Sequence, residues 1–449
     1  AVIGAGPAGI AAAVTAAAHG KRVVLVDAAQ RAGGQIWRSR ADAAPHVDAG
    51  TAASPSTSNS AASSSSSRTT ALPSTARHWL SRLRLSDVNH LTGAEVISAA
   101  QVDGGFVLAL ERVGPPGTDP VRTVRAARLV IATGARELFL PFPGWTQPGV
   151  VGVGGAQALL KAGWDVRGRR AVVAGSGPLL LPVAAALARA GTRVVEVAEQ
   201  APRAAVLAFA ASLWRNPSRL ADAVRYRAAF AGAPYHTGTW VQRAHGDGAL
   251  ERVTLTDGRR QRDVPCDLLC TGFGLTPATE LARALGCETR RGAVVVDDEQ
   301  RTSVAGIFCA GEPTGIAGAD AALVQGRIAG LAATGVTAPS GLARRRTAAA
   351  HAAARMHDAF ALRPELASLA GADTLVCRCE DVRFGEIAEC GGAREAKLVT
   401  RMAMGACQGR VCGPAVRHLL GWTEDTVRAP LFPARIETLI DYGSDHEEE

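Results

Sequence analysis

The hydrophobic pattern of the first thirty residues predicts a strand, a helix and a second strand. Val2 and Ile3 form a short apolar pair, residues 10–19 are apolar and rich in alanine, and residues 23–26 are all aliphatic before Asp27. Short apolar runs are typical of strands buried in a parallel sheet, whereas the longer run is typical of a helix. The order of these elements predicts a β-α-β unit at the start of the chain.

A glycine turn joins this first strand to the helix. Residues 4–9 read Gly-Ala-Gly-Pro-Ala-Gly, which has the spacing G-x-G-x-x-G. In dinucleotide-binding units the first glycine (Gly4) allows the tight turn, the second (Gly6) lets a pyrophosphate approach, and the third (Gly9) lets helix and strand pack closely. The pyrophosphate lies at the helix N-terminus, and an acid at the end of the second strand, here Asp27, accepts hydrogen bonds from a ribose. The spacing therefore predicts a dinucleotide site.

The composition changes after this unit. Residues 33–38 read Gly-Gly-Gln-Ile-Trp-Arg, and the glycine pair either forms a plain turn or lets the backbone pass close to a flat ring system. Residues 41–77 consist mainly of Ala, Ser, Thr and Pro without periodicity. Such a segment cannot bury enough apolar surface to offset its ordering entropy, so we interpret it as a disordered insertion.

Beyond the insertion, the pattern changes from a helix to alternating strands. We expect an amphipathic helix over residues 79–86. Alternation of apolar and polar positions then predicts an antiparallel meander. Its strands would be residues 93–100, 105–112 and 121–125. The apolar run 129–133 predicts a further buried strand, which ends at Gly134 in a turn of small residues.

A second strand–turn–helix–strand unit spans residues 171–199. Gly175 and Gly177 match the first two glycines of the dinucleotide motif, and Glu199 ends the second strand. Leu180 stands at the third glycine position, where its bulk should push helix and strand apart. Two interpretations remain open: a site for a second nucleotide, or a retained fold with a weakened or altered site.

The remaining α/β pattern lies between residues 306 and 360. Residues 306–312 read as a strand that runs into a turn at Gly311 and Glu312, with a helix from Ala319 onward. An acid at the carboxyl end of a central strand can bind ligand hydroxyls, although a solvated loop carboxylate is the alternative. Residues 342–360 predict a helix rich in Ala and Arg that links two lobes, with its arginine cluster on a solvated face.

Four cysteines near the C-terminus form two close pairs. Cys377 and Cys379 are spaced C-x-C, and Cys407 and Cys412 are spaced C-x₄-C among several glycines. In an extended segment the side chains of residues i and i+2 point to the same side, so Cys377 and Cys379 are expected to bind the same group. Four thiolates are typical of zinc or an iron–sulfur cluster. Structural zinc usually has C-x₂₋₄-C spacing in both halves, so the spacing favours iron–sulfur and leaves zinc as the alternative.

Composition limits the classes of function. The chain has 449 residues, enough for two to three domains, with 47% apolar and 20% charged residues. Only three of its 49 basic residues are lysines, and no basic stripe with interleaved aromatics accompanies the net charge of +8, so we expect no nucleic-acid partner. No apolar run reaches the length of a membrane span and no signal peptide precedes the first strand, so we expect a cytoplasmic protein. Nine cysteines without a secretion signal argue against a disulfide scaffold.

Five segments together resemble a known family. They are residues 33–38, residues 175–180, residues 270–275, residues 311–316, and the paired cysteines with residues 400–405. The chain resembles the FAD-containing α-type subunits of bacterial hetero-oligomeric amino-acid dehydrogenases and oxidases, such as opine oxidase, hydrogen cyanide synthase and the proline or hydroxyproline dehydrogenases. The resemblance extends over nearly the whole chain apart from the insertion. The C-terminal part is similar to bacterioferritin-associated ferredoxin, which holds a 2Fe-2S cluster.

The resemblance implies an α/β flavoprotein with two Rossmann-like dinucleotide-binding domains and a small, α-rich 2Fe-2S domain. The implied FAD domain comprises residues 1–150 and 280–340, the second Rossmann-like domain residues 151–279, a helical linker residues 341–370, and the 2Fe-2S domain residues 371–449. The residues expected to bind nucleotide are Gly4, Gly6, Pro7, Ala8, Gly9, Asp27, Gly34, Gln35, Thr133, Gly134, Gly311 and Glu312 for FAD, and Gly175, Gly177 and Glu199 for a second adenine nucleotide, NAD(P) or ATP. The expected cluster ligands are Cys377, Cys379, Cys407 and Cys412.

In such complexes amine oxidation is thought to reside on a separate β subunit with its own flavin. The resemblance therefore implies a second flavoprotein as partner, leaves room for a further small subunit or for peripheral membrane association through a partner, and assigns this chain to electron transfer. We identify no catalytic residue, and no C-x₂-C or C-x₄-C lies near either glycine turn, which argues against a disulfide reductase. The alternatives are a self-sufficient NAD(P)H-dependent ferredoxin-type reductase and a non-catalytic redox sensor.

Overall fold

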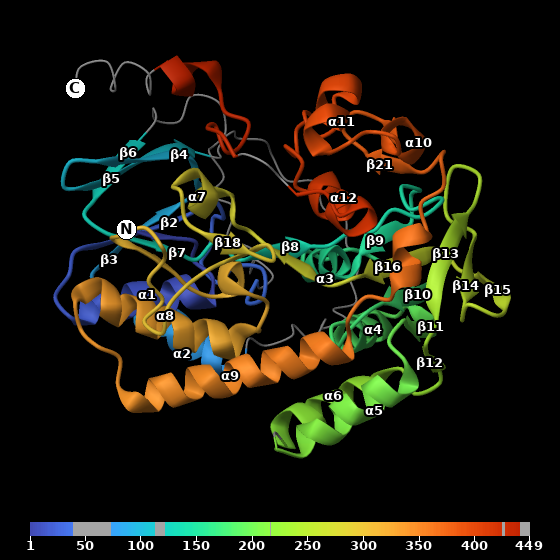
Figure 1. Ribbon diagram of the computed structural model, residues 1–449. Helices are drawn as coiled ribbons and strands as arrows, with labels where there is room; N and C mark the ends of the chain where they lie inside the picture. Colours follow the sequence, from blue (N-terminus) through green and yellow to red (C-terminus); the bar gives the residue numbers. More distant parts are fainter. Residues whose placement is uncertain (39–72, 113–121, 216, 424–426, 441–449) are drawn as a thin grey trace, which may run out of the picture.

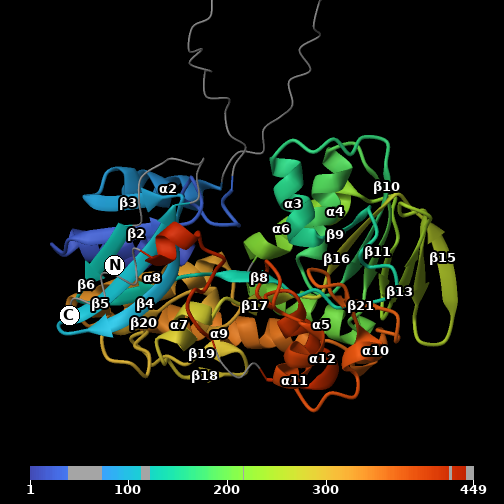
Figure 2. The same cartoon turned by 90° about the horizontal axis from the view of Figure 1, so that it is seen from above.

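The protein consists of two α/β lobes and a small third lobe. The computed structural model describes residues 1–38, 73–112, 122–215, 217–423 and 427–440. The first lobe lies on the left of Figure 1 and the second on the right, with the third lobe above the second. Strands β8 (Ala135–Glu137) and β17 (Leu275–Pro277) pair antiparallel and lie between the first two lobes (Figure 1 and Figure 2).

The first lobe is built on a five-stranded parallel sheet. Its strands lie in the order β20 (Ile307–Cys309), β7 (Leu129–Ile131), β1 (Val2–Ile3), β2 (Val23–Asp27) and β3 (Val88–Thr92). One face is covered by the helices α1 (Pro7–Ala18), α2 (Ser74–Arg84) and α8 (Ala319–Thr334). The other face is covered by the antiparallel meander of β4 (Ala94–Val102), β5 (Gly105–Arg112) and β6 (Arg122–Ala126).

Side chains alternate between these two faces because successive residues of a strand point in opposite directions. In β1, Val2 belongs to the helix-side core and Ile3 to the meander-side core. In β2, Leu25 and Val26 divide in the same way. The fully apolar runs read from the sequence are therefore strands buried on both faces.

The second lobe repeats this architecture. Its parallel sheet has the order β12 (Tyr235–Thr237), β11 (Arg193–Glu199), β10 (Arg170–Gly175), β16 (Leu268–Gly272) and β9 (Val150–Gly152). Helices α3 (Val153–Lys161) and α4 (Leu180–Arg189) cover one face. A three-stranded antiparallel sheet of β13 (Trp240–His245), β14 (Arg252–Thr256) and β15 (Gln261–Pro265) covers the other. A helical hairpin of α5 (Arg203–Ser212), η1 (Leu213–Arg215) and α6 (Pro217–Ala229) leaves this lobe after β11.

The C-terminal third of the chain connects all three lobes. After β17, the chain returns to the first lobe through α7 (Glu280–Ala284), β18 (Thr289–Arg290), β19 (Ala293–Val294), β20 and η2 (Glu312–Thr314). The long helix α9 (Ser340–Ala359) then runs below the first lobe in Figure 1, ends beside α4 of the second lobe and leads to η3 (Pro364–Ser368). The third lobe contains β21 (Leu375–Cys377), β22 (Val382–Arg383), α10 (Phe384–Ile387), α11 (Ala393–Thr400) and α12 (Cys412–Leu420).

The structure confirms the predicted fold class and corrects several boundaries. The predicted helix over residues 79–86 begins earlier, at Ser74, so the last residues of the expected insertion are helical; residues 41–72 lie outside the described residues. Leu180 does not force helix and strand apart, because its side chain is completely buried in the core of the second lobe. Residues 427–440 do not all stay with the third lobe: Leu431 lies in the core of the first lobe, and its N–H donates to the carbonyl of Ile97.

Candidate functional site

The first glycine turn combines tight packing with one open position. A Cβ on Gly4 would collide with the carbonyl of Ala132, and a Cβ on Gly9 would collide with the carbonyl of Gly4. Gly6, which caps the N-terminus of α1, is different: a Cβ there would meet no atom within 4 Å. Pro7 occupies the first turn of α1, which contains no acidic residue, so the positive end of the helix dipole faces this open space.

Asp27 lies at the carboxyl end of β2, as predicted, and both of its oxygens take part in the turn. One carboxylate oxygen accepts a hydrogen bond from the N–H of Ala5, and the other accepts from the N–H of Ala29 at 2.7 Å. The carboxylate is only partly buried, so its remaining lone pairs are accessible to ribose hydroxyls. Asp27 therefore holds the turn in shape and faces the same open space.

The second glycine pair lies directly against this turn. The N–H of Gly33 donates to the carbonyl of Ala5 at 2.7 Å, and a Cβ on Gly34 would come within 2.9 Å of the Cα of Gly6. Gln35 is exposed, whereas Trp37 is buried in the core beside α1. Two backbone segments therefore approach each other closely at this glycine pair, so the pair is not a plain surface turn.

Gly311 and Glu312 lie next to the start of α1 but make different contacts. A Cβ on Gly311 would come within 2.8 Å of the Cβ of Ala8. The carboxylate of Glu312 accepts hydrogen bonds from the N–H groups of Ala317 (3.1 Å) and Gly318 (2.8 Å), the residues that lead into α8. Burial raises the pKa of Glu312, and these backbone bonds oppose the rise. Glu312 is therefore a loop-shaping acid rather than a solvated carboxylate.

Three further residues of this site were not predicted from the sequence. Gln325 accepts hydrogen bonds from the N–H of Gly311 at 2.7 Å and from the hydroxyl of Thr314 at 3.3 Å. A Cβ on Gly326 would collide with the carbonyl of Ala8, and one on Gly330 would come within 2.6 Å of the carbonyl of Ala12. Two glycines four residues apart in an otherwise good helix were the available signal, because that spacing places both on one face.

Thr133 and Gly134 lie where the first lobe meets the connection to the second. The hydroxyl of Thr133 donates to the carbonyl of Ala278 at 2.6 Å, and the N–H of Ala278 donates to the carbonyl of Gly134 at 3.0 Å. A Cβ on Gly134 would meet no atom within 4 Å. Like Gly6, Gly134 faces open space, so the two residues fit the predicted nucleotide site.

The second glycine turn, at Gly175 and Gly177, follows a strand and precedes a helix like the first, but other parts of the protein surround it. A Cβ on Gly175 would collide with the carbonyl of Gly272, so this glycine serves the close approach of β10 and β16. Glu199 is completely buried, and its two carboxylate oxygens accept hydrogen bonds from the N–H groups of Gly177 and Ala201, both at 2.8 Å. Burial raises the pKa of Glu199 to about 7.

The four C-terminal cysteines come together. The thiols of Cys377 and Cys412 are in hydrogen-bond contact, and so are those of Cys379 and Cys407, while Cys377 and Cys379 also interact electrostatically. Cys379 lies in the turn that follows β21, so the two residues do not share one extended strand, and their expected hold on one bound group stays a prediction. A Cβ on Gly405 would collide with the Cβ of Cys379, which explains a glycine at this position.

Electrostatics make one of these thiols acidic. The hydrogen bond from the Cys412 thiol and those from the N–H groups of Ala403, Glu380 and Cys379 lower the pKa of Cys377 to about 5, although burial opposes them. The same contact with Cys377 raises the pKa of Cys412. Within the described residues, no group of three or more His, Cys, Asp or Glu side chains could hold a metal ion. The four-cysteine ligand set therefore stays a prediction.

The other five cysteines differ from this cluster in environment. Cys266, Cys270, Cys287 and Cys309 are buried, and Cys390 is partly buried. Burial raises the pKa of Cys266 to about 12 and also raises the pKa of Cys270 and Cys309, so these thiols are poor nucleophiles. All nine cysteines belong to the described residues, and all are free thiols.

Arg410 links the cysteine cluster to the first lobe. Its guanidinium donates to the carbonyls of Cys407 (3.3 Å) and Leu431, and it lies 3.8 Å from the centre of the Phe432 ring. Leu431 belongs to the core of the first lobe. The loop that carries Cys407 is therefore attached to the meander side of the first lobe.

The two parallel sheets, each with a glycine turn at a helix start, define an oxidoreductase fold with two dinucleotide-binding lobes. Residues 1–329 match the family described as pyridine nucleotide-disulphide oxidoreductase, so the chain belongs to that family and is an oxidoreductase with a flavoprotein fold. Among the described residues no helix is both long and apolar enough to cross a membrane.

Two curated relatives match along nearly the whole chain. The first is the A subunit of opine oxidase from Rhizobium meliloti (strain 1021), which is 33% identical over 98% of this chain and 98% of the relative. The second is the HcnB subunit of hydrogen cyanide synthase from Pseudomonas aeruginosa, which is 30% identical over 99% of this chain and 98% of the relative. L-proline dehydrogenase from P. horikoshii has a similar fold, with a TM-score of 0.62 and 19% identity over 98% of this chain and 78% of that chain. The resemblance to subunits of this kind is thereby confirmed.

Proposed function

We propose that this chain is the FAD- and 2Fe-2S-containing electron-transfer subunit of a hetero-oligomeric amino-acid or amine dehydrogenase or oxidase. The substrate class would be of the opine, proline, hydroxyproline or glycine type. Relatives at 30% to 33% identity carry names of oxidase or synthase subunits, which supports a role beside a partner. We propose that the partner is a second flavoprotein that carries the amine oxidation.

The first glycine turn fits the flavin dinucleotide. Gly6 and Gly134 leave open space beside the N-terminus of α1, and Asp27 borders that space with a partly exposed carboxylate. These residues would hold the pyrophosphate and the adenosine ribose, while Gly34 and the turn at Gly311 would bring backbone close to the rest of the cofactor. When bound, the flavin would accept an electron pair and release the electrons one at a time.

The cysteine contacts are the observation that carries the proposed function. Two thiol pairs, Cys377 with Cys412 and Cys379 with Cys407, lie in one lobe. The pairs also interact with each other, Cys377 with Cys379 and Cys407 with Cys412, so all four thiols gather in one place. Four thiolates suit a binuclear cluster or zinc, and the C-x-C spacing, which departs from that of structural zinc sites, favours the cluster. The acidic thiol of Cys377 and the backbone N–H groups around it suit a thiolate ligand.

Replacement of one ligand tests this proposal. The Cys407→Ser variant should keep its flavin absorbance, lose the visible iron–sulfur bands and fail to sustain substrate-driven electron transfer with the co-expressed partner. Cys390→Ser is the matched control, because Cys390 is a partly buried thiol of the same lobe that makes none of these contacts. It should keep both chromophores.

Metal and substrate assays separate the proposal from its alternatives. Anaerobically purified protein should contain about two iron and two acid-labile sulfide per chain, as a 2Fe-2S cluster requires. One equivalent of zinc without iron would contradict the proposal. Turnover by this chain alone, with NADH as electron donor and no partner, would favour the NAD(P)H-dependent reductase instead.

A further inference from the structure

The two glycine turns have the same spacing, but their second glycines have different neighbours. A Cβ on Gly6 would meet no atom within 4 Å. A Cβ on Gly177 would lie 3.9 Å from the Cγ atom of Phe360, which comes from a distant part of the sequence. Phe360 begins a short segment, residues 360–363, which joins α9 to η3 and which we name the strap. The space that a pyrophosphate needs beside the second turn is thus bordered by the strap.

Hydrogen bonds attach the strap to the second turn and to the end of β11. The hydroxyl of Ser176 donates to the carbonyl of Phe360 at 2.9 Å. The side-chain amide of Gln200 donates to the carbonyl of Ala361 at 3.1 Å and accepts from the N–H of Arg363 at 3.1 Å. The same amide also donates to Ser176 at 2.8 Å. Polar groups at the carboxyl ends of β10 and β11 are therefore bound to peptide backbone.

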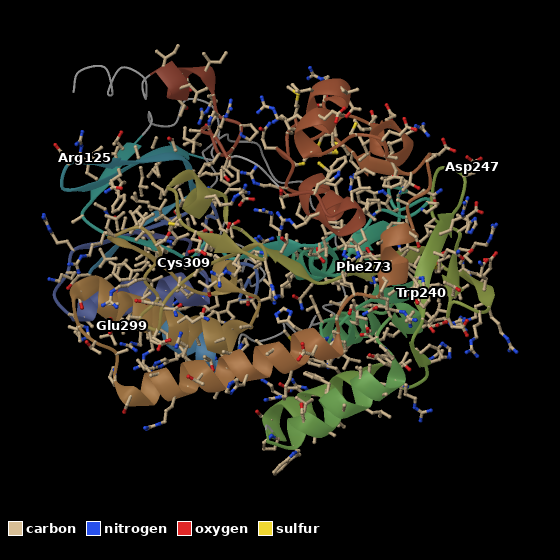
Figure 3. All side chains as sticks on the ribbon, in the orientation of Figure 1. Arg125, Trp240, Asp247, Phe273, Glu299 and Cys309 are labelled. Carbon is tan, nitrogen blue, oxygen red and sulfur yellow. The ribbon has the colours of Figure 1, made fainter. Side chains whose placement is uncertain are left out.

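Side-chain contacts hold the strap from both directions. The ring of Phe360 meets the ring of Phe209 of α5 edge-on, with 5.1 Å between the ring centres. The guanidinium of Arg363 lies 4.5 Å from the centre of the Trp240 ring, and Trp240, labelled in Figure 3, lies on β13. Just beyond the strap, Leu366 is completely buried in the core of the second lobe. The strap is consequently a packed part of this lobe.

The acid of the second unit, Glu199, is also inaccessible to ligands. Glu199 has no exposed surface, whereas Asp27 in the first unit is partly exposed. Both oxygens of Glu199 accept backbone N–H groups, from Gly177 and Ala201. This fully buried carboxylate is therefore not accessible to a ribose hydroxyl.

We propose that the second dinucleotide-type turn binds the chain's own strap in place of a pyridine nucleotide and thereby fixes the third lobe to the second. Ser176 and Gln200 are then positioning residues for the lobe that carries the four cysteines. The role in electron transfer rests on the proposed function, but the exclusion of NAD(P)H does not. The chain would accordingly receive electrons from its partner and not from NADH or NADPH.

A binding experiment on the unaltered holoprotein tests the exclusion. Isothermal titration with NADH, and separately with NADPH, should show no saturable binding up to about 1 mM, since the turn is already bound to the strap. Neither coenzyme should bleach the flavin at a turnover-relevant rate. Saturable binding of either one with a Kd below about 100 μM would overturn the proposal.

Limited proteolysis tests whether these contacts hold the strap in place. Gln200→Ala removes both hydrogen bonds between its side-chain amide and the strap. Chymotrypsin cleavage after Leu362, followed by mass spectrometry, should then be at least about tenfold faster than in the wild type, since cleavage follows local opening. Gln261→Ala, on the exposed edge strand β15, is the control and should leave this rate unchanged. Phe360→Ala provides a second variant with the same expectation.

Unchanged chymotrypsin cleavage after Leu362 in both Gln200→Ala and Phe360→Ala would overturn the proposed attachment of the strap. Neither measurement requires iron or a partner protein. If the proposed function failed, for example because the purified protein contained zinc, the coenzyme titration and the cleavage rates would still decide this inference.

Discussion

At the scale of single residues, the three glycines of the first motif fall into two kinds. Gly4 and Gly9 make room for protein backbone, since a Cβ on either would collide with a carbonyl oxygen. Gly6 is open, since a Cβ there would meet no atom within 4 Å, and it borders the space that we propose for the FAD pyrophosphate. Substitutions at these positions should therefore separate folding from cofactor binding.

Gly6→Val should abolish FAD binding without unfolding the protein. The valine side chain would occupy the space proposed for the pyrophosphate, while its Cβ would meet no protein atom within 4 Å. The bound FAD of the purified variant, measured by absorbance after heat release, should be close to zero, with an unchanged circular dichroism spectrum. Gly341→Val, at another open glycine at the start of α9, should keep its flavin. A fully flavinated Gly6→Val protein would contradict the assignment.

Glu199 should make the protein less stable as the pH rises. The folded protein holds the pKa of this buried acid at about 7, above its ordinary value of 4.5, so the folded state favours the protonated form. Stability is fully present below pH 4.5 and is lost as the pH rises through 7, by an amount of about 3 kcal/mol. Urea unfolding at pH 5 and pH 8 should show this loss for the wild type and a smaller one for Glu199→Gln. Equal pH dependence in both proteins would contradict the prediction.

At the scale of elements, the contact between α1 and α8 determines the nucleotide site. Gly326 and Gly330 on α8 face Ala8 and Ala12 on α1, so the two helices approach with no side chain between them. The N-terminus of α8 follows the turn at Gly311, and the N-terminus of α1 follows the turn at Gly6. The packing of these two helices therefore fixes the relative positions of two turns that are far apart in the sequence but adjacent in the first lobe.

Gly326→Ala should lower stability although alanine is the better helix former. The added methyl group would collide with the carbonyl of Ala8 and push the helices apart, at a cost of about 1–3 kcal/mol. Thermal unfolding should show a melting temperature lower by several degrees and a weaker retention of flavin. Gly341→Ala, which meets no atom, should be neutral or slightly stabilising. A melting temperature for Gly326→Ala equal to that of this control would show that the helices can separate freely.

At the scale of the whole molecule, the third lobe is attached to both larger lobes. On the second lobe the indole N–H of Trp145 donates to the carbonyl of Leu375 at 2.7 Å. The strap attaches it to the second lobe, and the contact of Arg410 with Leu431 and Phe432 attaches it to the first. These attachments place the cysteine cluster at a defined position relative to both sheets. Figure 1 shows the resulting arrangement, with α12 above β9 and α3.

Arg410→Ala should loosen the third lobe. It removes two hydrogen bonds to carbonyl oxygens and the contact with the Phe432 ring, which together stabilise by about 1–3 kcal/mol. Hydrogen exchange should increase in residues 405–412 and 427–435, while exchange in the second sheet stays the same. Arg394→Ala, an exposed arginine of α11, is the control. Unchanged exchange in both segments would show that Arg410 is not an attachment.

Removal of residues 41–72 should leave the folded lobes intact. Their composition lacks a core-forming pattern, and α2, which packs in the first core, begins only at Ser74. We expect the same FAD content and a melting temperature within about two degrees of the wild type, because a segment whose composition cannot form a core contributes little to stability. Loss of flavin together with a large drop in melting temperature would show that this segment covers the cofactor.

The sequence by itself determined those features that depend on local backbone chemistry. Glycine spacing at residues 4–9, apolar strand runs and the alternation of the meander each reflect a constraint within a few residues, and the structure confirms the predicted fold class. Asp27 could be placed at the end of its strand for the same reason. The candidate site was predictable as far as its turns, because a tight turn constrains residue type directly.

Only the tertiary structure decided which segments meet across long separations. Cys377 contacts Cys412, Phe360 covers Gly177, and Leu431 returns to the first core. No local pattern encodes such contacts, because they depend on shape and burial after the chain has folded. The two glycine turns illustrate the difference: their spacing is alike, but one faces open space and the other a distant segment of the same chain, since packing and not the motif determines what lies beside a turn.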